Sequence, residues 1–304
     1  MKNKNNFDVI IVGGSYAGLS AAMALGRALR KVLIIDSGLP CNRYTPHSHN
    51  FITQDGEKPH KIAEKALDQV LKYDTVTIKK VLATTGKKTK NGFVIETEKG
   101  EDFEAKKLIF ATGVKDILPK LEGFEECWGN TIIHCPYCHG YEVKNEKTGI
   151  LANGEIAFHY ARLIRNWTKD LTIFTNGKPS FSEEQHTKLV RHNISVIEKE
   201  VTSFNHKNGQ LEQIIFKDNS MTEIKAIYTS PPFEQHCKIP ETLGCELTEQ
   251  GHLKVNEFCQ TNIPNIFACG DATTPFRSVA FAVSAGNIAG AMLNHQLVEK
   301  EFEL

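Results

Sequence analysis

Residues 7–36 read FDVIIVGGSYAGLSAAMALGRALRKVLIID, and this stretch decides the fold. The runs 7–12 and 31–36 are short, apolar and rich in β-branched residues, so both predict buried strands. Between them, a glycine turn leads into apolar residues at helical spacing over 19–30. The order strand, turn, helix, strand predicts a βαβ unit, the building block of a parallel sheet.

The glycine turn departs from the dinucleotide-binding fingerprint at its middle position. Gly13 permits the tight turn and Gly18 permits close packing of helix on strand, whereas Ser15 replaces the glycine that lets the backbone approach a pyrophosphate. The helix N-terminus would supply amide donors and a positive dipole to that anion. Asp36 ends the second strand, where a carboxylate accepts hydrogen bonds from a ribose 2′-hydroxyl. With these features in register, the stretch predicts a dinucleotide site.

A second copy of this arrangement begins at residue 148. Residues 148–164, TGILANGEIAFHYARLI, predict a strand, a turn of small residues and a helix, and the strand LTIFTNG follows at 171–177. The fingerprint positions are here occupied by Ala152, Gly154 and Ala157. Two nucleotide-binding domains of one kind are the simplest interpretation, and two unrelated βα units are the alternative.

The second domain is expected to interrupt the first. The strand-like LIFATG at 108–113 precedes the second copy, and FACGD at 267–271 follows it. We therefore predict an α/β fold of two Rossmann-like, three-layer nucleotide-binding domains, the second inserted into the first. The predicted boundaries are 1–115 with 243–304 for the first domain and 116–242 for the second. The crossings should lie near 114–123 and 240–244, where proline or glycine occurs.

The composition is that of an ordinary globular chain. Of 304 residues, 40% are hydrophobic, and 36 Lys plus Arg balance 36 Asp plus Glu, which gives no support for nucleic-acid binding. No apolar run approaches the roughly 18 residues of a membrane span, and the first residues lack the apolar core of a signal peptide. We therefore expect a cytoplasmic protein with no membrane partner. Eight cysteines are too dilute here for a disulfide scaffold.

One pair of cysteines is closely spaced, in the tetrad Cys135-Pro136-Tyr137-Cys138. Two thiols separated by two residues at a helix start can close a disulfide, and the helix terminus stabilises the first thiolate. Inert buried cysteines are one alternative. A zinc site that includes His134 and His139 is another, but a structural zinc site usually needs a second pair of ligands, which this sequence lacks. The pattern favours a redox dithiol and no metal.

Five motifs occur in order along the chain: GGSYAG, Asp36, LIFATG, CPYC, and FACGDA before a long helix. In this order they resemble the low-molecular-weight thioredoxin reductases, over essentially the whole chain. These are FAD-dependent pyridine nucleotide-disulfide oxidoreductases. HCPYCHGYE resembles the branch of dithiol oxidases that form disulfides in gliotoxin and holomycin biosynthesis. The resemblance implies a homodimeric enzyme that passes electrons between NADPH or NADH, FAD, the cysteine pair and a substrate. That substrate would be a thioredoxin-like protein or a small disulfide or dithiol.

The resemblance also implies site residues. FAD would lie in the outer domain, with its pyrophosphate at the glycine turn, its ribose on Asp36, and the helix that begins near Ser278 aimed at the flavin. Cys138 would be the flavin-side sulfur and Cys135 the sulfur that exchanges with substrate. The implied catalytic residues are Cys135, Cys138 and His139. The implied cofactor-binding residues are Gly13, Gly14, Ser15, Ala17, Gly18, Asp36, Arg43, Asn50, Val81, Thr112, Gly113, Gly154, Gly270, Asp271, Ser278 and Val279.

The sequence departs from the family's pattern in two places. Related reductases carry an acid after the second cysteine, whereas this chain has His139, which could move a proton near neutral pH or make a structural hydrogen bond. The strand at 171–177 ends in Thr175 and Asn176, where NADPH-dependent members have basic residues for the 2′-phosphate. The resemblance still favours a reductase as the first expectation. A dithiol oxidase that uses oxygen and a non-catalytic flavin redox sensor are the alternatives.

Overall fold

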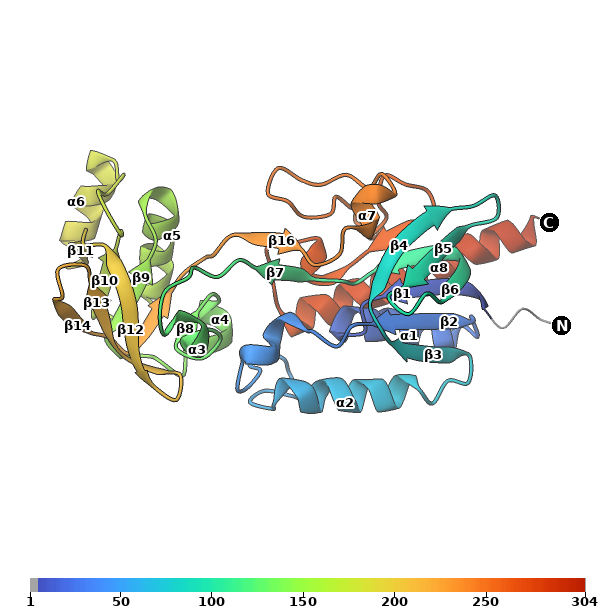
Figure 1. The fold of residues 1–304 in the computed structure, drawn as a ribbon, viewed down its shortest axis with the longest axis horizontal. Helices are drawn as coiled ribbons and strands as arrows, with labels where there is room; N and C mark the ends of the chain where they lie inside the picture. The colour runs from blue at the N-terminus through green and yellow to red at the C-terminus, as the bar shows by residue number, and fades with distance from the viewer. Residues whose placement is uncertain (1–4, 304) are drawn as a thin grey trace. The chain divides into compact units, whose positions relative to one another are not determined.

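The computed structural model describes residues 5–303, which form two compact units. Unit 1 is Met1–Arg43, Lys58–Lys115 and Phe233–Leu304, and unit 2 is Tyr44–Glu57 and Asp116–Pro232. The elements of both units are labelled in Figure 1. Each unit has its own parallel sheet with helices against it, which confirms the predicted α/β fold with two Rossmann-like units.

The observed division differs from the predicted domain boundaries in two places. The stretch 240–244, predicted to be a crossing, lies inside unit 1, where α7 (Ile239–Thr242) packs Ile239 into the hydrophobic core. Pro240 stands in the first turn of α7, and proline starts a helix as readily as it marks a linker. The segment Tyr44–Glu57, predicted to belong to the first domain, groups instead with unit 2.

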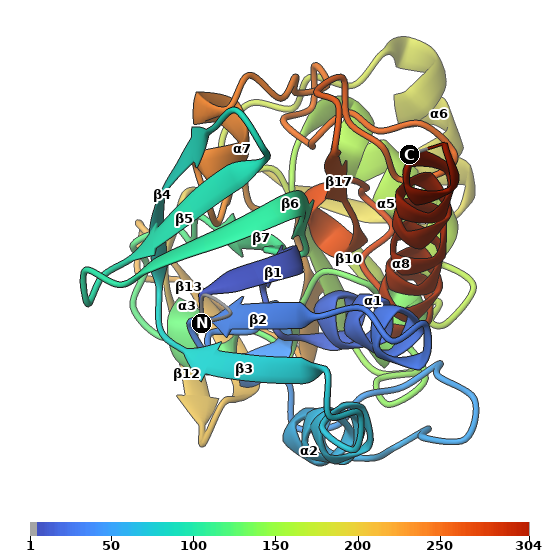
Figure 2. The same ribbon diagram turned by 90° about the vertical axis from the view of Figure 1, so that its right-hand side faces the viewer.

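Unit 1 is built on a seven-stranded sheet (Figure 2). Its path runs β3-β2-β1-β6-β5-β4, and β17 also pairs with β6. The parallel strands are β1 (Asn6–Val12), β2 (Val32–Asp36), β3 (Val76–Lys80), β6 (Asp102–Phe110) and β17 (Ile266–Ala268). The hairpin of β4 (Ala83–Lys88) and β5 (Phe93–Thr97) adds two antiparallel strands. The parallel register brings the ends of β1, β2 and β6 to one edge of the sheet.

The helices of unit 1 are α1 (Tyr16–Arg27), α2 (Pro59–Val70), α7 and α8 (Val279–Phe302), with short 3₁₀ turns at Cys41–Tyr44 and Gly270–Ala272. Helices α1 and α8 lie side by side (Figure 2). A Cβ at Gly286 would overlap the carbonyl oxygen of Ala17, and one at Gly290 would come within 2.7 Å of that of Ala21. The small residues of α8 are therefore required by close backbone contact.

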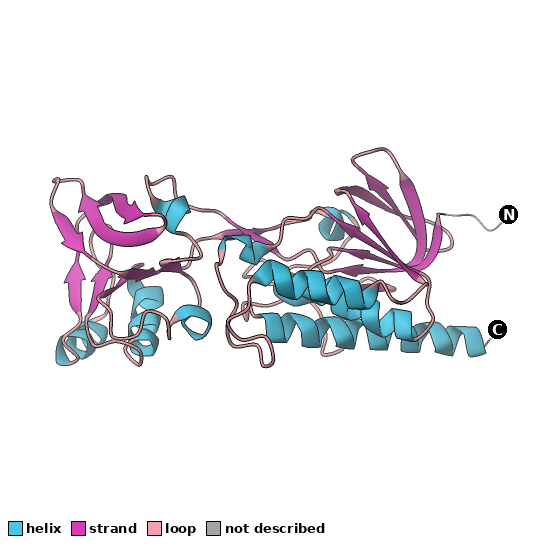
Figure 3. Ribbon diagram, turned by 90° about the horizontal axis from the view of Figure 1, so that it is seen from below, coloured by secondary structure: helices cyan, strands magenta, loops and turns pink. Residues whose placement is uncertain are grey.

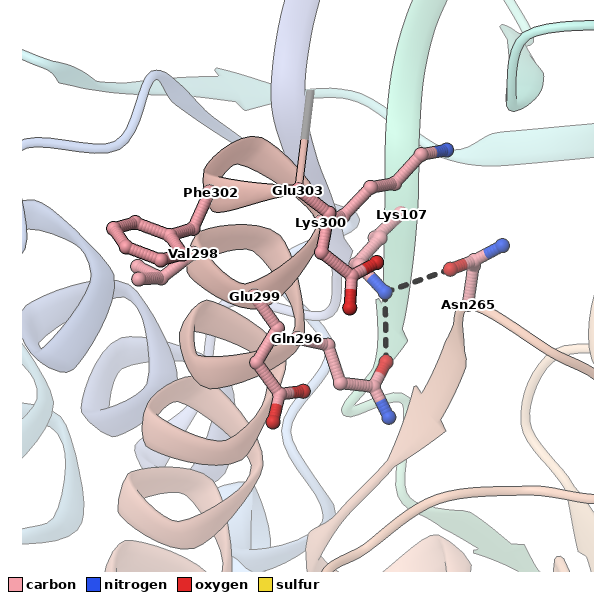
Figure 4. A pocket seen from close by; sticks show the side chains of 8 residues that line it. All are labelled: Lys107, Asn265, Gln296, Val298, Glu299, Lys300, Phe302 and Glu303. Carbon is pink, nitrogen blue, oxygen red and sulfur yellow. Dashed lines mark hydrogen bonds between the residues drawn. The ribbon is translucent and has the colours of Figure 1, made fainter.

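A buried amine joins the far end of α8 to the sheet. Lys107 on β6 is only 4% exposed, and its Nζ donates to Oδ1 of Asn265 at 2.6 Å and to Oε1 of Gln296 at 2.7 Å (Figure 4). These three residues line a pocket of about 630 Å³ beside the last turns of α8. Burial lowers the pKa of Lys107 to about 8, and the two amide oxygens replace hydration that the amine has lost.

Unit 2 has a five-stranded parallel sheet in the order β11-β10-β9-β15-β8. These strands are β8 (Ile132–Ile133), β9 (Thr148–Leu151), β10 (Leu171–Phe174), β11 (Ser195–Ile197) and β15 (Ala226–Tyr228). A three-stranded antiparallel sheet holds β12 (Val201–Lys207), β13 (Gln210–Phe216) and β14 (Met221–Glu223). The helices are α3 (Phe124–Cys127), α4 (Pro136–His139), α5 (Gly154–Ile164) and α6 (Glu183–Arg191). Helices α5 and α6 share one hydrophobic core, whereas α3 packs with the antiparallel sheet in another. Figure 3 distinguishes helices from strands by colour.

The two units are linked by paired strands, β7 (Val114–Asp116) and β16 (Phe233–Gln235). Over residues 5–303, none of the helices combines the length and the apolar character that crossing a bilayer requires.

Candidate functional site

The first glycine turn joins β1 to α1 and leaves no room for side chains. Gly13 has φ +105°, and a Cβ there would overlap the carbonyl oxygen of Ala111. A Cβ at Gly18 would overlap the carbonyl oxygen of Gly13. The amide of Gly14 donates to Oδ1 of Asp36 at 2.9 Å, which places the carboxylate at the end of β2 directly over the turn. The turn and the acid are thus assembled as the sequence predicted.

Helix α1 begins at this turn with its first amides open. Ser15 is the N-cap residue, but its side chain makes no capping hydrogen bond. At the end of the neighbouring strand β6, the buried hydroxyl of Thr112 has no hydrogen-bond partner in the described part of the chain. Gly113 follows with φ +63° and open space where its Cβ would stand. Uncapped amides, an unpartnered hydroxyl and a partly exposed carboxylate fit the phosphates and ribose of a dinucleotide such as FAD.

The other predicted cofactor residues lie in two groups. Those in unit 1 include Val81, whose amide donates to the carbonyl of Asp36 at 2.9 Å, and Gly270, where a Cβ would approach that of Ala17 at 2.9 Å. Ser278 caps α8, accepting a hydrogen bond from the amide of Phe281 at 3.1 Å. Arg43, Asp271 and Val279 also belong to unit 1, whereas Asn50 and Gly154 belong to unit 2.

The short helix α4 holds the tetrad, with Cys135 at its N-cap and Cys138 within it. Cys135 is the N-cap residue in extended conformation, and its carbonyl accepts hydrogen bonds from the amides of Cys138 and His139, both at 3.2 Å. Pro136 is buried in the first turn, whereas Tyr137 is 62% exposed. Both cysteines are half-buried. One turn of helix therefore presents the two thiols together at the edge of unit 2.

A tyrosine that sequence reasoning missed faces the cysteine pair. Tyr228 ends β15 and is paired in register with Ile133 of β8, two residues before Cys135. The side chain of Tyr228 is fully buried, and its hydroxyl has no hydrogen-bond partner among the described residues. Burial, and then the negative charges of Cys135 and Glu142, raise the pKa of Tyr228. This hydroxyl consequently stays protonated beside the dithiol.

His139, the residue after Cys138, has a strongly shifted pKa. Burial lowers the pKa of His139 to about 4, the nearby charge of Glu142 partly opposing this shift. The imidazole is therefore neutral at pH 7 and binds a proton only weakly, whereas the sequence suggested that it could move a proton near neutral pH. Its ring lies 6.4 Å, centroid to centroid, from that of His49 in the segment Tyr44–Glu57.

The second nucleotide turn is closed by its own side chains. Asn153 caps α5: its Oδ1 accepts the amide of Gly154 at 2.8 Å and that of Ser180 at 2.9 Å. Its Nδ2 donates to the carbonyl of Lys178 at 2.9 Å, so the segment after β10 is tied across the helix start. Glu155 adds a carboxylate in the first turn. These contacts occupy the first amide of α5 and place a carboxylate beside it, and both features disfavour a pyrophosphate at this turn.

The end of β10 is also committed to internal hydrogen bonds. Thr175 is buried, and its hydroxyl donates to the carbonyl of Gly177 at 2.6 Å. Oδ1 of Asn176 accepts the amide of Val201 at 2.7 Å. A 2′-phosphate normally binds an arginine or lysine side chain, and these residues offer neither charge.

Comparison with known proteins places this geometry in a family. A family model described as pyridine nucleotide-disulphide oxidoreductase matches residues 7–287. The thioredoxin reductase sirT of Leptosphaeria maculans is 31% identical over 309 residues, covering 95% of this chain and 94% of its own. The crystal structure of an oxidoreductase from Agrobacterium tumefaciens is 36% identical with a TM-score of 0.90, over 96% of this chain and 99% of its own. The crystal structure of HlmI is 27% identical in sequence with a TM-score of 0.93, covering 100% of this chain and 96% of its own.

These similarities span nearly the whole chain, including both units and the tetrad that follows β8 and continues into α4. They confirm the resemblance that the glycine turn, the CPYC tetrad and FACGD indicated. The chain belongs to the pyridine nucleotide-disulphide oxidoreductase family and is a thioredoxin reductase-like, FAD-dependent disulfide oxidoreductase.

Proposed function

We propose that this flavoprotein is a dithiol oxidase: it oxidises a substrate with two thiols to a disulfide at Cys135 and Cys138 and delivers the electron pair to dioxygen. The observation that carries the proposal is the closed second nucleotide turn. Because Asn153 occupies the first amide of α5 and ties the segment after β10 across the helix start, electrons would enter through the dithiol and not from a pyridine nucleotide.

FAD would be held in unit 1 by the turn Gly13–Gly18, Asp36, Thr112 and the residues around Ser278. When bound, it supplies a two-electron acceptor that dioxygen reoxidises, with hydrogen peroxide as the reduced product. The chain itself supplies the tight turn, the open amides of α1 and the carboxylate that distinguishes a ribose from a phosphate-bearing sugar.

The dithiol chemistry proceeds by two exchanges at the disulfide form of the pair. A substrate thiolate attacks Sγ of Cys135, the bond to Cys138 breaks, and Cys138 leaves as the thiolate. The second substrate thiolate attacks the substrate sulfur of the mixed disulfide and releases Cys135. The substrate is thereby oxidised to its disulfide, and the pair is reduced by the same two electrons.

His139 would accept the proton that each substrate thiol loses. The imidazole is neutral at pH 7 and directly follows Cys138 in the chain. The substrate is a small dithiol or a protein with a cysteine pair, because Cys135 and Cys138 lie at the edge of unit 2 and are only half-buried.

A thioredoxin reductase fed by NADPH or NADH is the second candidate, and it is favoured by the family assignment and by relatives such as sirT. In that direction the reduced pair would instead reduce a thioredoxin-like protein or a small disulfide. We propose a homodimer for either function.

Anaerobic stopped-flow reduction of the FAD-loaded protein distinguishes the two. Dithiothreitol is expected to bleach the flavin absorbance, and NADPH and NADH are expected to leave it unchanged on the same timescale. The Cys135→Ser variant should not respond to dithiothreitol. Rapid bleaching by either nucleotide would establish the reductase and overturn the proposed oxidase.

A further inference from the structure

The segment Tyr44–Glu57 brings a second histidine to the dithiol site of unit 2. The ring of His49 lies 6.4 Å from that of His139, edge to face, a separation that one bridging water can span. The charge of His49 also acts on the pKa of His139. The two imidazoles are thus neighbours although they are far apart in sequence.

Two carboxylates hold His49 in this position. Its Nε2 lies 3.5 Å from Oε1 of Glu142, and its Nδ1 lies 3.6 Å from Oδ1 of Asp55. Asp55 also accepts the amide of Asn50 at 2.7 Å, and the segment is closed by a hydrogen bond from the amide of Ser48 to the carbonyl of Glu57 at 2.8 Å. The loop is therefore tied to itself, and both imidazole nitrogens face an acceptor.

Exposure rises along this set of side chains. The side chain of His49 is 21% exposed, that of Glu142 is 41% exposed, and that of Asp55 is 68% exposed. The set runs from the half-buried His139 to groups that exchange protons directly with solvent.

The proposed chemistry needs such an exit. Each thiol exchange leaves a proton on His139, and a half-buried imidazole that binds protons weakly must pass them on before the next exchange. We propose that His49 is the proton acceptor for His139 and that it transfers the proton to Glu142 and Asp55 at the surface. This inference rests on the proposed dithiol exchange at Cys135 and Cys138, and it serves that exchange in either direction.

The proton balance closes without a further reagent. A substrate thiol gives its proton to His139, His139 gives it to His49, and His49 releases it through either carboxylate to water. The groups facing His49 are Asp55 and Glu142, the ring of His139, and the ring of His47 at 6.5 Å.

The test measures disulfide reduction without the flavin signal. The oxidised holoprotein is mixed with dithiothreitol without oxygen, quenched with acid at set times, and alkylated, so that the reduced pair is counted by mass. His49→Gln is expected to slow reduction at pH 7 by about 10- to 100-fold, part of the roughly 10²–10⁴-fold that a positioned proton-transfer group provides. Added imidazole should restore much of the rate.

The matched control is His47→Gln, since His47 is an exposed histidine two residues away in the same loop. Dithiothreitol should reduce the Cys135–Cys138 disulfide of this variant at the wild-type rate. The defect of His49→Gln should shrink above about pH 8.5, where the thiols of dithiothreitol ionise unaided. Glu142→Gln should show a smaller defect of the same kind. This variant tests the relay if His49→Gln does not fold.

Three results would overturn the relay: wild-type rates in both His49→Gln and Glu142→Gln, a defect that imidazole leaves unchanged, or a defect equal at all pH values. The last two would make His49 a structural residue. Failure of the proposed dithiol function would be distinguishable from failure of the relay, because dithiothreitol would then not reduce the wild-type protein at all.

Discussion

At the level of single residues, the neutral state of His139 has a consequence for stability. Its pKa in the folded protein is about 4, below the ordinary 6.5. As the pH falls from 6.5 towards 4, the unfolded chain binds a proton that the folded chain does not, so the free energy of unfolding decreases. The contribution is fully present above pH 6.5 and is lost as the pH falls through 4.

We therefore expect wild-type protein to lose more stability than His139→Gln between pH 7 and pH 4.5, by about 1 kcal/mol after discounting for solvent screening. Urea unfolding at a fixed FAD concentration measures both. Equal losses in the two proteins would show that His139 is not held neutral by burial.

At the level of elements, the contact between α1 and α8 sets the stability of unit 1. Gly286→Ala would place a methyl group onto the carbonyl oxygen of Ala17. Because backbone cannot move as a flexible side chain does, the two helices must separate, at a cost of about 1–3 kcal/mol. The urea midpoint should fall accordingly.

The control on the same helix is Ser284→Ala, on the exposed face of α8. Its free energy of unfolding should stay within about 0.5 kcal/mol of the wild-type value. A Gly286→Ala variant as stable as this control would mean that α8 does not need a glycine against α1.

At the level of the whole molecule, the two units have separate hydrophobic cores, which implies that ligands stabilise the units separately. Unit 1 holds the core around β1, β2 and β6, and unit 2 holds the cores around β13 and α5. FAD at 100 times its dissociation constant should add about 2.7 kcal/mol to the stability of the unit that binds it.

Hydrogen exchange locates this effect along the chain. On adding FAD to apoprotein, we expect slower exchange over 9–18, 108–113 and 270–282, and little change over 148–177. NADPH should leave 148–177 unchanged as well. Protection of 148–164 by NADPH would contradict the closed turn at Asn153.

Local sequence patterns were sufficient for the elements around both glycine turns, for the α/β class and for the CPYC tetrad. The reason is that a βαβ unit and a two-residue spacing between thiols depend on residues close together in the chain. The acid at the end of β2 followed from the same short repeat, because parallel strands end at one edge. Composition misplaced the second crossing, since Pro240 starts α7 instead of a linker.

Long-range packing alone established the surroundings of the dithiol. His49 reaches His139 because the segment Tyr44–Glu57 folds onto unit 2, and Tyr228 reaches the pair because β15 lies beside β8. The pKa of His139 depends on burial by residues from several elements, which no spacing in the sequence reveals. The sequence thus specified which groups carry the redox chemistry, whereas tertiary contacts determined their protonation and their neighbours, because both depend on burial and on segments distant in the chain.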